Sequence, residues 1–147
     1  MYKKTQFGWV PFWITMPMIA ISSLITLFAV PKDQLLIPVI VTCSLLFVLL
    51  IFKDLTVSVN DEKLNLRYGI GLVFKNIDLE QIASCVKVRN PWWVGWGIRI
   101  GPSFTLFNIS GFDAVELSFK DGRRKIRIGT AEPDELAAAI NSKIKTG

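Results

Sequence analysis

The sequence predicts an α+β membrane protein, in which an N-terminal transmembrane helical hairpin precedes a small antiparallel β-domain with one closing helix. Two apolar runs, residues 12–30 and 35–52, contain no Asp, Glu, Lys, Arg or His, and each can cross a hydrocarbon core of about 30 Å as a helix. Alternating apolar and polar residues follow, which is typical of half-buried β-strands. From about residue 132 to residue 144 the apolar residues recur at the spacing of an amphipathic helix. We therefore divide the chain into a hairpin, 1–53, and a domain, 54–147.

The basic residues around the two apolar runs predict the orientation of the hairpin. Lys3 and Lys4 precede the first run and Lys53 follows the second, whereas the short connection carries one Lys beside one Asp. The positive-inside rule therefore places both termini in the cytoplasm. The first run is similar to a signal peptide, but no small-residue cleavage site ends it and a second run follows almost at once. We expect a retained helix.

Hydroxyl side chains fall at similar depths in the two runs, at Ser22, Ser23, Thr26, Thr42 and Ser44. They can form hydrogen bonds between the two helices, each worth about 0.6 kcal/mol, or simply allow close packing. Neither run contains the ionisable group that a transporter or proton relay needs. The hairpin is therefore interpreted as an anchor.

The composition argues against most catalytic chemistry. The sequence contains no His and two cysteines, and Cys43 lies within the second apolar run, far from Cys85. A Ser-His-Asp triad and a structural zinc site are thereby excluded, and isolated cysteines suit a reducing compartment. Gly69-Ile70-Gly71 lacks the third glycine and the helix of a dinucleotide loop. We expect a protein that is not an enzyme and binds no cofactor or metal.

Two hairpins of the predicted sheet have a defined register. Apolar and polar residues alternate in residues 55–59 and in residues 64–68. A hairpin that pairs Val59 with Leu64 at one end and Leu55 with Tyr68 at the other puts all the apolar residues on one face. The preferred turn Asp121-Gly122 pairs residues 114–120 with residues 123–128. In this second hairpin Glu116 faces Arg127 on the solvent side, as a pair worth about 0.2–1 kcal/mol.

The stretch between these hairpins is rich in tryptophan and glycine. Trp92 and Trp93 are candidates for insertion among lipid headgroups or for contact with a partner, and Trp96 is expected in the core. The alternative is that one of the two neighbours joins Trp96 in filling the mouth of the barrel. Residues 98–107 are interpreted as one bent or bulged strand. Arg99 is expected to form a structural ion pair with Asp113 or Glu116.

A basic triplet, Arg123-Arg124-Lys125, lies at the tip of the last hairpin. Such a tip either binds lipid phosphate or is a solvated turn. The formal net charge of +5, next to a predicted membrane anchor, favours anionic lipid over nucleic acid as a partner. The candidate membrane or partner surface therefore consists of Trp92, Trp93, Arg123, Arg124 and Lys125.

The order of several short motifs resembles a known class of domain. These motifs are Trp96-Gly97-Ile98-Arg99, Asn108-Ile109-Ser110-Gly111, Asp121-Gly122, and Ile128-Gly129-Thr130 with Pro133 following. About seven short antiparallel strands closed by one helix are similar to a pleckstrin-homology-like (PH-like) β-barrel, and the chain resembles small bacterial membrane proteins with such a domain. The resemblance covers about residues 55–145. It implies a protein of the bacterial inner membrane that binds or assembles, since such folds are rarely enzymes.

Two functions remain open from the sequence. The first is a protein-docking or complex-assembly module whose partner is another membrane or membrane-associated protein. The alternative is a membrane-anchored module that senses anionic lipid headgroups through the five candidate surface residues.

Overall fold

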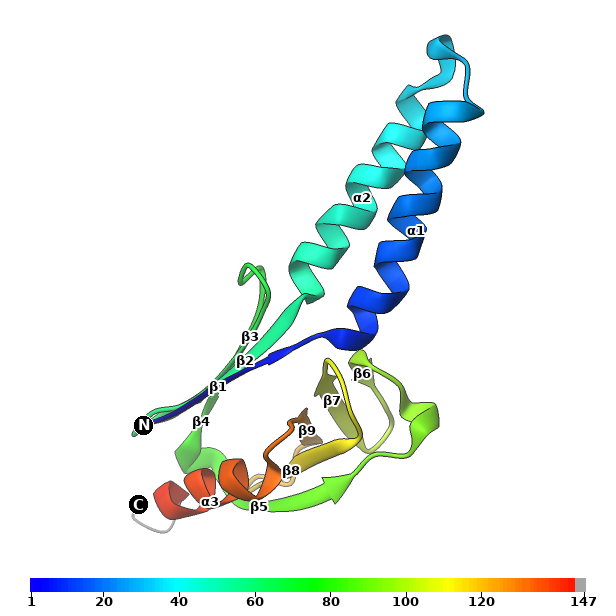
Figure 1. Ribbon diagram of the computed structural model, residues 1–147. Helices are drawn as coiled ribbons and strands as arrows, with labels where there is room; N and C mark the ends of the chain where they lie inside the picture. Colours follow the sequence, from blue (N-terminus) through cyan, green and yellow to red (C-terminus); the bar gives the residue numbers. More distant parts are fainter. Residues whose placement is uncertain (145–147) are drawn as a thin grey trace.

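The computed structural model, which describes residues 1–144, has the α+β composition that the sequence predicts (Figure 1). Two apolar helices, α1 (Trp9–Phe28) and α2 (Leu36–Phe52), form a hairpin through the short 3-10 helix η1 (Lys32–Gln34). α1 thus begins three residues before the predicted start and ends two residues before the predicted end. With 20 residues, α1 is long and apolar enough to cross a membrane, whereas α2 is a shorter apolar helix of 17 residues.

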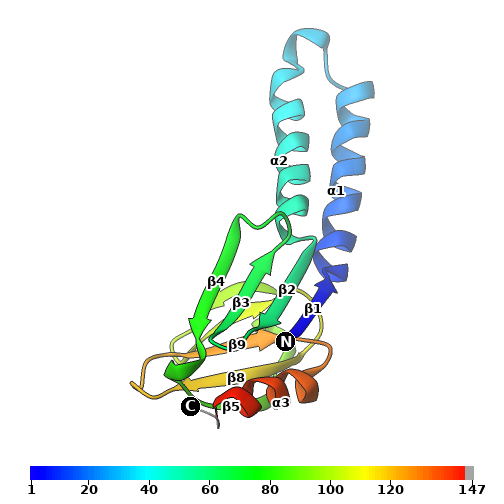
Figure 2. The same ribbon diagram turned by 90° about the vertical axis from the view of Figure 1, so that its left-hand side faces the viewer.

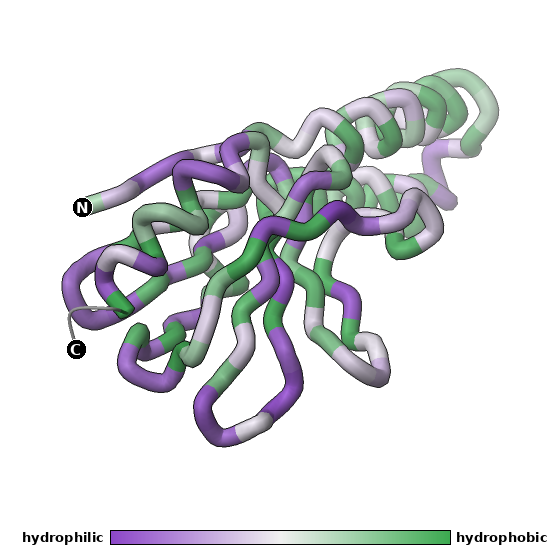
Figure 3. The backbone as a smooth tube through the Cα atoms, turned by 90° about the horizontal axis from the view of Figure 1, so that it is seen from below, coloured by the Kyte–Doolittle hydropathy of each residue, from purple (hydrophilic) through white to green (hydrophobic). Residues whose placement is uncertain are grey.

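The two helices pack along each other and leave most of their surface exposed. Ser22 Oγ lies 2.8 Å from Thr42 Oγ1, which confirms a hydrogen bond between the helices at the predicted depth. Thr26 and Ser44 instead donate to carbonyl groups of their own helices. Thr15 is the only buried residue in the two helices. Figure 3 shows that the hairpin is mainly hydrophobic, while hydrophilic residues gather in the domain and the connecting loop.

Sheet A consists of four antiparallel strands in the order β1 (Tyr2–Phe7), β2 (Asp54–Val59), β3 (Lys63–Tyr68) and β4 (Val73–Asp78) (Figure 2). The predicted register of β2 and β3 is confirmed, from Val59 opposite Leu64 to Leu55 opposite Tyr68. The sequence pattern predicts no strand over residues 2–7. They nevertheless pair with β2 along its whole length.

The ladder between β1 and β2 joins the hairpin directly to the domain. Phe7 lies opposite Asp54, and the Gly8 amide donates to the Lys53 carbonyl over 2.7 Å. α1 starts two residues after β1 ends, and β2 starts two residues after α2 ends. The hairpin is therefore an insertion between two neighbouring strands, with no flexible linker on either side.

Sheet B contains the remaining strands, β5 (Ile82–Arg89), β6 (Gly97–Ile100), β7 (Phe104–Asn108), β8 (Asp113–Phe119) and β9 (Lys125–Gly129), in the order β5-β8-β9-β7-β6. The β7–β9 pair is parallel and the other pairs are antiparallel. β6 and β7 form a hairpin closed by the Gly101 amide and the Phe104 carbonyl, so the prediction of one bent strand over residues 98–107 is wrong.

The predicted closed barrel of about seven strands is also wrong, because residues 1–144 contain nine strands that form two separate sheets. The 3-10 helix η2 (Leu79–Gln81) connects β4, the last strand of sheet A, to the first strand of sheet B. Within residues 1–144 no ladder joins an edge of one sheet to an edge of the other. The sheets instead meet through their apolar faces, as layers.

The core lies between the two sheets and under the C-terminal helix α3 (Pro133–Ile144). Sheet A contributes fully buried residues such as Leu55 and Leu64, and sheet B contributes Val115 and Leu117. α3 packs on β5 and β8 through Leu136 and Ile140, neither of which is exposed. The helix begins one residue after the predicted start and reaches the predicted end.

The last hairpin has the register that the Asp121-Gly122 turn predicts. Val115 lies opposite Ile128, and Leu117 lies opposite Ile126. β9 begins only at Lys125, so the first two residues of the basic triplet lie in the turn outside the ladder.

Candidate functional site

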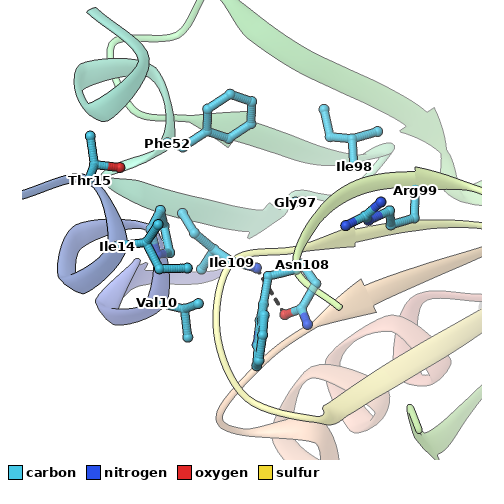
Figure 4. Close-up of a pocket in the computed structure, with 11 residues that line it drawn as sticks. Val10, Ile14, Thr15, Phe52, Gly97, Ile98, Arg99, Asn108 and Ile109 are labelled. Atoms are coloured by element: carbon cyan, nitrogen blue, oxygen red, sulfur yellow. Dashed lines mark hydrogen bonds between the residues drawn. The ribbon is translucent and has the colours of Figure 1, made fainter. Parts of the chain in front are cut away.

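A cavity of about 480 Å³ lies where the base of the helical hairpin meets the β6–β7 edge of sheet B (Figure 4). We call it the hairpin-base cavity. The helices contribute Val10, Pro11, Ile14, Thr15 and Phe52. The domain contributes Trp96, Gly97, Ile98, Arg99, Asn108 and Ile109. Its walls therefore come from three parts of the chain that are far apart in sequence.

The Asn108 side chain fixes the turn on the domain side of this cavity. Asn108 is buried, donates through Nδ2 to the Gly111 carbonyl over 3.1 Å and accepts the Ile109 amide at Oδ1 over 2.9 Å. A Cβ atom on Gly129 would overlap the Asn108 carboxamide, so only glycine allows this close approach. Asn108, Gly111 and Gly129 thus have a shared structural role. Pro133, another residue of the motif pattern, is the buried first residue of α3.

The guanidinium of Arg99 contributes an exposed positive charge to the wall of the hairpin-base cavity. Its side chain is exposed and its guanidinium lies over Gly95. The predicted ion pair with Asp113 or Glu116 is not formed, and within residues 1–144 no carboxylate lies within ion-pair distance of Arg99. Of the described residues that line the cavity, Arg99 is the only charged one.

The tryptophans occupy two different environments. Trp92 and Trp93, in the 3-10 helix η3 (Trp92–Val94), are 74% and 71% exposed, and their rings form an edge-to-face pair with centroids 6.1 Å apart. Trp96 is half-buried rather than fully in the core. Its ring centre lies 6.0 Å from that of Phe112, and its buried Nε1–H has no hydrogen-bond partner among the described residues. The Trp92–Trp93 pair therefore forms an exposed aromatic surface on the domain.

Two members of the basic triplet are engaged in contacts within the domain. Arg123 donates to Gln81 Oε1 over 2.6 Å, and its guanidinium carbon lies 3.9 Å from the centre of the Phe119 ring. Lys125 donates to Glu116 over 2.7 Å. The Arg123 contacts hold the tip against η2 and the end of β8, and the Lys125 contact joins the start of β9 to the middle of β8.

The five candidate surface residues therefore divide between two places. Gln81, the partner of Arg123, directly precedes β5, whereas Trp92 follows the other end of that strand. The basic tip lies at the end of the domain away from the hairpin (Figure 2). The segment between β5 and β6, which contains the 3-10 helix η3, lies at the side of the domain below the base of α1 (Figure 1). The five residues do not form one continuous surface.

A buried ion-pair cluster in sheet B consists of Glu116, Lys125 and Arg127. Lys125 Nζ and Arg127 Nε each lie 2.7 Å from a carboxylate oxygen of Glu116. Glu116 is only 7% exposed, so the prediction that it faces solvent is wrong. Arg127 also donates to Asn90 and stacks over Phe104. Burial alone would raise the pKa of the Glu116 carboxyl, but the hydrogen bonds and charges of Lys125 and Arg127 outweigh it and hold that pKa below its ordinary value.

In residues 1–144 no group of three or more His, Cys, Asp or Glu side chains is arranged to hold a metal ion. Burial raises the pKa of Cys85 to about 12, so this thiol stays protonated and unreactive at neutral pH. Short sequence motifs identify Trp96, Gly97, Arg99 and Asn108, but these motifs do not predict that the four residues lie beside the hairpin.

No model of a known protein family matches the chain, and no curated protein matches it either. The likeness to bacterial PH-like proteins therefore depends on the order of the short motifs alone.

Proposed function

We propose that this chain is an integral protein of the bacterial inner membrane whose PH-like domain docks another protein. The exposed apolar surface of the hairpin supports insertion into a membrane, because water would meet large side chains along both helices. α2 has 17 residues and a length of about 25 Å. A modest thinning of the bilayer accommodates such a helix at small cost.

The ladder between β1 and β2 supports two crossings. β1 precedes α1 and β2 follows α2, so the ends of the hairpin lie on the same side of any bilayer that the hairpin enters. Lys3, Lys4 and Lys53 lie on that side, which the positive-inside rule assigns to the cytoplasm. The C-terminal helix packs on the same domain, so both termini are cytoplasmic in this proposal.

The observation that carries the docking function is the exposure of the Trp92–Trp93 pair. Tryptophan, tyrosine and arginine are the residue types enriched at the energetic centres of protein interfaces. The two rings already contact each other edge to face, which restricts their side-chain rotamers. Little side-chain entropy is therefore lost when a partner covers the pair. The direct connection between domain and hairpin supports a position of this surface beside the membrane, which favours a membrane or membrane-associated protein as the partner.

Sensing of anionic lipid by all five candidate surface residues is less well supported. The tip and the tryptophans lie at opposite ends of β5, and Arg123 and Lys125 already have partners. A single membrane plane would therefore not meet both groups.

A photo-crosslinking experiment in native membranes tests the docking function. A benzophenone amino acid replaces Trp93 in the full chain, and the matched control carries it at Arg124, on the basic tip. We expect a protein adduct of one discrete mass from position 93, its yield reduced by Trp92→Ala, and none from position 124. Adducts of equal yield from both positions, adducts with lipid alone, or repeated recovery of the chain without a partner would contradict the proposal.

Cysteine labelling tests the membrane topology separately. Asp33→Cys, in the connection between the helices, is expected to react with an impermeant maleimide in intact cells, while Lys120→Cys reacts only after lysis. Reaction of both positions, or of neither, in intact cells would refute the cytoplasmic placement of the domain.

A further inference from the structure

We propose that the hairpin-base cavity binds one anionic phospholipid molecule, with the lipid phosphate on Arg99 and an acyl chain against α1 and α2. This inference rests on the proposed insertion of the hairpin. It assigns a ligand class to a site that is separate from the Trp92–Trp93 docking surface.

The position of the cavity places it at the level of lipid headgroups. Its helical wall is formed by the first two turns of α1 and by the last residue of α2. Trp9 and Trp13, in the same turns of α1, are 58% and 66% exposed. Tryptophans at a helix end are typical of the membrane–water interface. The lipids around the hairpin are therefore the molecules closest to the opening.

The charge of the cavity selects for an anion. Arg99 has no carboxylate partner among the described residues, and Figure 4 shows its guanidinium directed from β6 toward the space beside Asn108. A guanidinium offers two parallel donors to a phosphate group. The Asn108 carboxamide is already bonded to Gly111 and Ile109, so it does not compete for the ligand.

The remaining wall is suited to hydrocarbon. Val10, Ile14 and Phe52 face the cavity from the helices, and Ile98 faces it from β6. A volume of about 480 Å³ lies within the range of ordinary ligand pockets. It holds a headgroup and the first part of one chain, and the rest of the lipid continues along α1 into the bilayer. A free phosphate ion would leave this apolar wall uncovered, which favours the lipid as the source of the phosphate.

Native mass spectrometry of the full chain in detergent tests the site. The probes are dioleoylphosphatidylglycerol, dioleoylglycerol, which lacks the phosphate, and inorganic phosphate. We expect one phosphatidylglycerol per chain, with affinity roughly tenfold lower in Arg99→Gln because a charge-assisted hydrogen bond is lost. Arg124→Gln, which removes the same charge from the basic tip, should bind as the wild type does. Dioleoylglycerol should not distinguish the wild type from Arg99→Gln.

A second pair of variants tests the apolar wall without changing the charge. Ile14→Trp fills the cavity, and Leu27→Trp places the same side chain on an exposed position of α1 outside the cavity. Only Ile14→Trp should weaken binding of phosphatidylglycerol. This pair also keeps the proposal testable if Arg99→Gln does not fold.

Several results would overturn the lipid site. Equal binding of phosphatidylglycerol by the wild type, Arg99→Gln and Ile14→Trp would do so, as would an equal loss in Arg124→Gln, which would indicate net charge alone. Displacement of the lipid by millimolar inorganic phosphate would identify free phosphate as the ligand instead. Extraction of the chain from membranes by alkaline carbonate would contradict the proposed insertion. Retention in the membrane without lipid binding would contradict only the site.

Discussion

Replacing Glu116 by Gln tests how strongly the buried ion-pair cluster of Glu116, Lys125 and Arg127 stabilises sheet B. The change keeps the size of the side chain and removes its charge. The Arg127 side chain, 20% exposed, then keeps its charge with no carboxylate beside it. Loss of one partner of a buried pair costs about 3–5 kcal/mol when both partners are fully buried.

The expected cost in this cluster is smaller, because both cations are partly solvated. Lys125 is 50% exposed, so its pair is worth about 0–1 kcal/mol. The stacking of Arg127 on Phe104 and its bond to Asn90 persist in the variant. We therefore expect Glu116→Gln to lower the free energy of unfolding by about 2–4 kcal/mol, a large part of the roughly 5–15 kcal/mol typical of a domain. Lys125→Met, the matched control, should cost about 1 kcal/mol or less.

The pH dependence gives this prediction a second, independent measurement. The folded-state pKa of Glu116 lies below its ordinary value, so its stabilising effect is complete above the unfolded-state pKa and is lost as the pH falls through the folded-state pKa. Urea unfolding of the detergent-solubilised chain, followed by tryptophan fluorescence, should show the wild type and Glu116→Gln converging below about pH 4. A difference under about 0.5 kcal/mol at pH 7, or one that stays constant with pH, would refute the reasoning.

Three further predictions concern single positions. Gly69 has φ +43° and lies against the carbonyl oxygens of the last turn of α2, so Gly69→Ala should lower the free energy of unfolding in urea by about 2–4 kcal/mol. The control Gly122→Ala is also at positive φ but in open space, and it should lower that free energy by only about 1 kcal/mol. Equal losses in the two variants would contradict the close approach at Gly69. Gln6→Ala removes bonds of 2.9 and 2.6 Å from β1 to Ser110 and should cost about 1–2 kcal/mol; unchanged protease sensitivity of residues 1–8 would argue against this contact. Cys85 should resist iodoacetamide at pH 8 until urea unfolds the domain, and rapid native labelling would contradict its burial.

Local sequence patterns predicted the elements of this fold well. The apolar runs identified both helices, and alternation identified the register of β2 with β3 because a slip of one residue would turn Leu64 and Leu66 toward solvent. β1 was missed because its pattern is weak, with Lys3 and Lys4 adjacent. Its partner strand begins 47 residues after its own last residue. The closed barrel was wrong because closure depends on how sheet edges meet, which no local pattern records.

The candidate sites show the same limit. Exposure of Trp92 and Trp93 was one of two open alternatives, and proline and glycine around them indicated an irregular loop without deciding it. The hairpin-base cavity could not be predicted, because Ile14 was assigned to the first apolar run and Arg99 to a strand 85 positions further along the chain. What joins them is the β1–β2 ladder, which brings the start of α1 against the domain.

That ladder also restricts how the two helices can move. Each helix continues almost directly into a strand, and the two strands are paired from Tyr2 opposite Val59 to Phe7 opposite Asp54. Sliding α1 along α2 would shear β1 against β2, and a shift of one residue, about 3.3 Å, would invert the faces of β1. The β1–β2 ladder therefore prevents α1 from sliding along α2 in small steps. A mechanical signal crossing it would either tilt helices and domain together as a lever, or detach β1 from the sheet altogether.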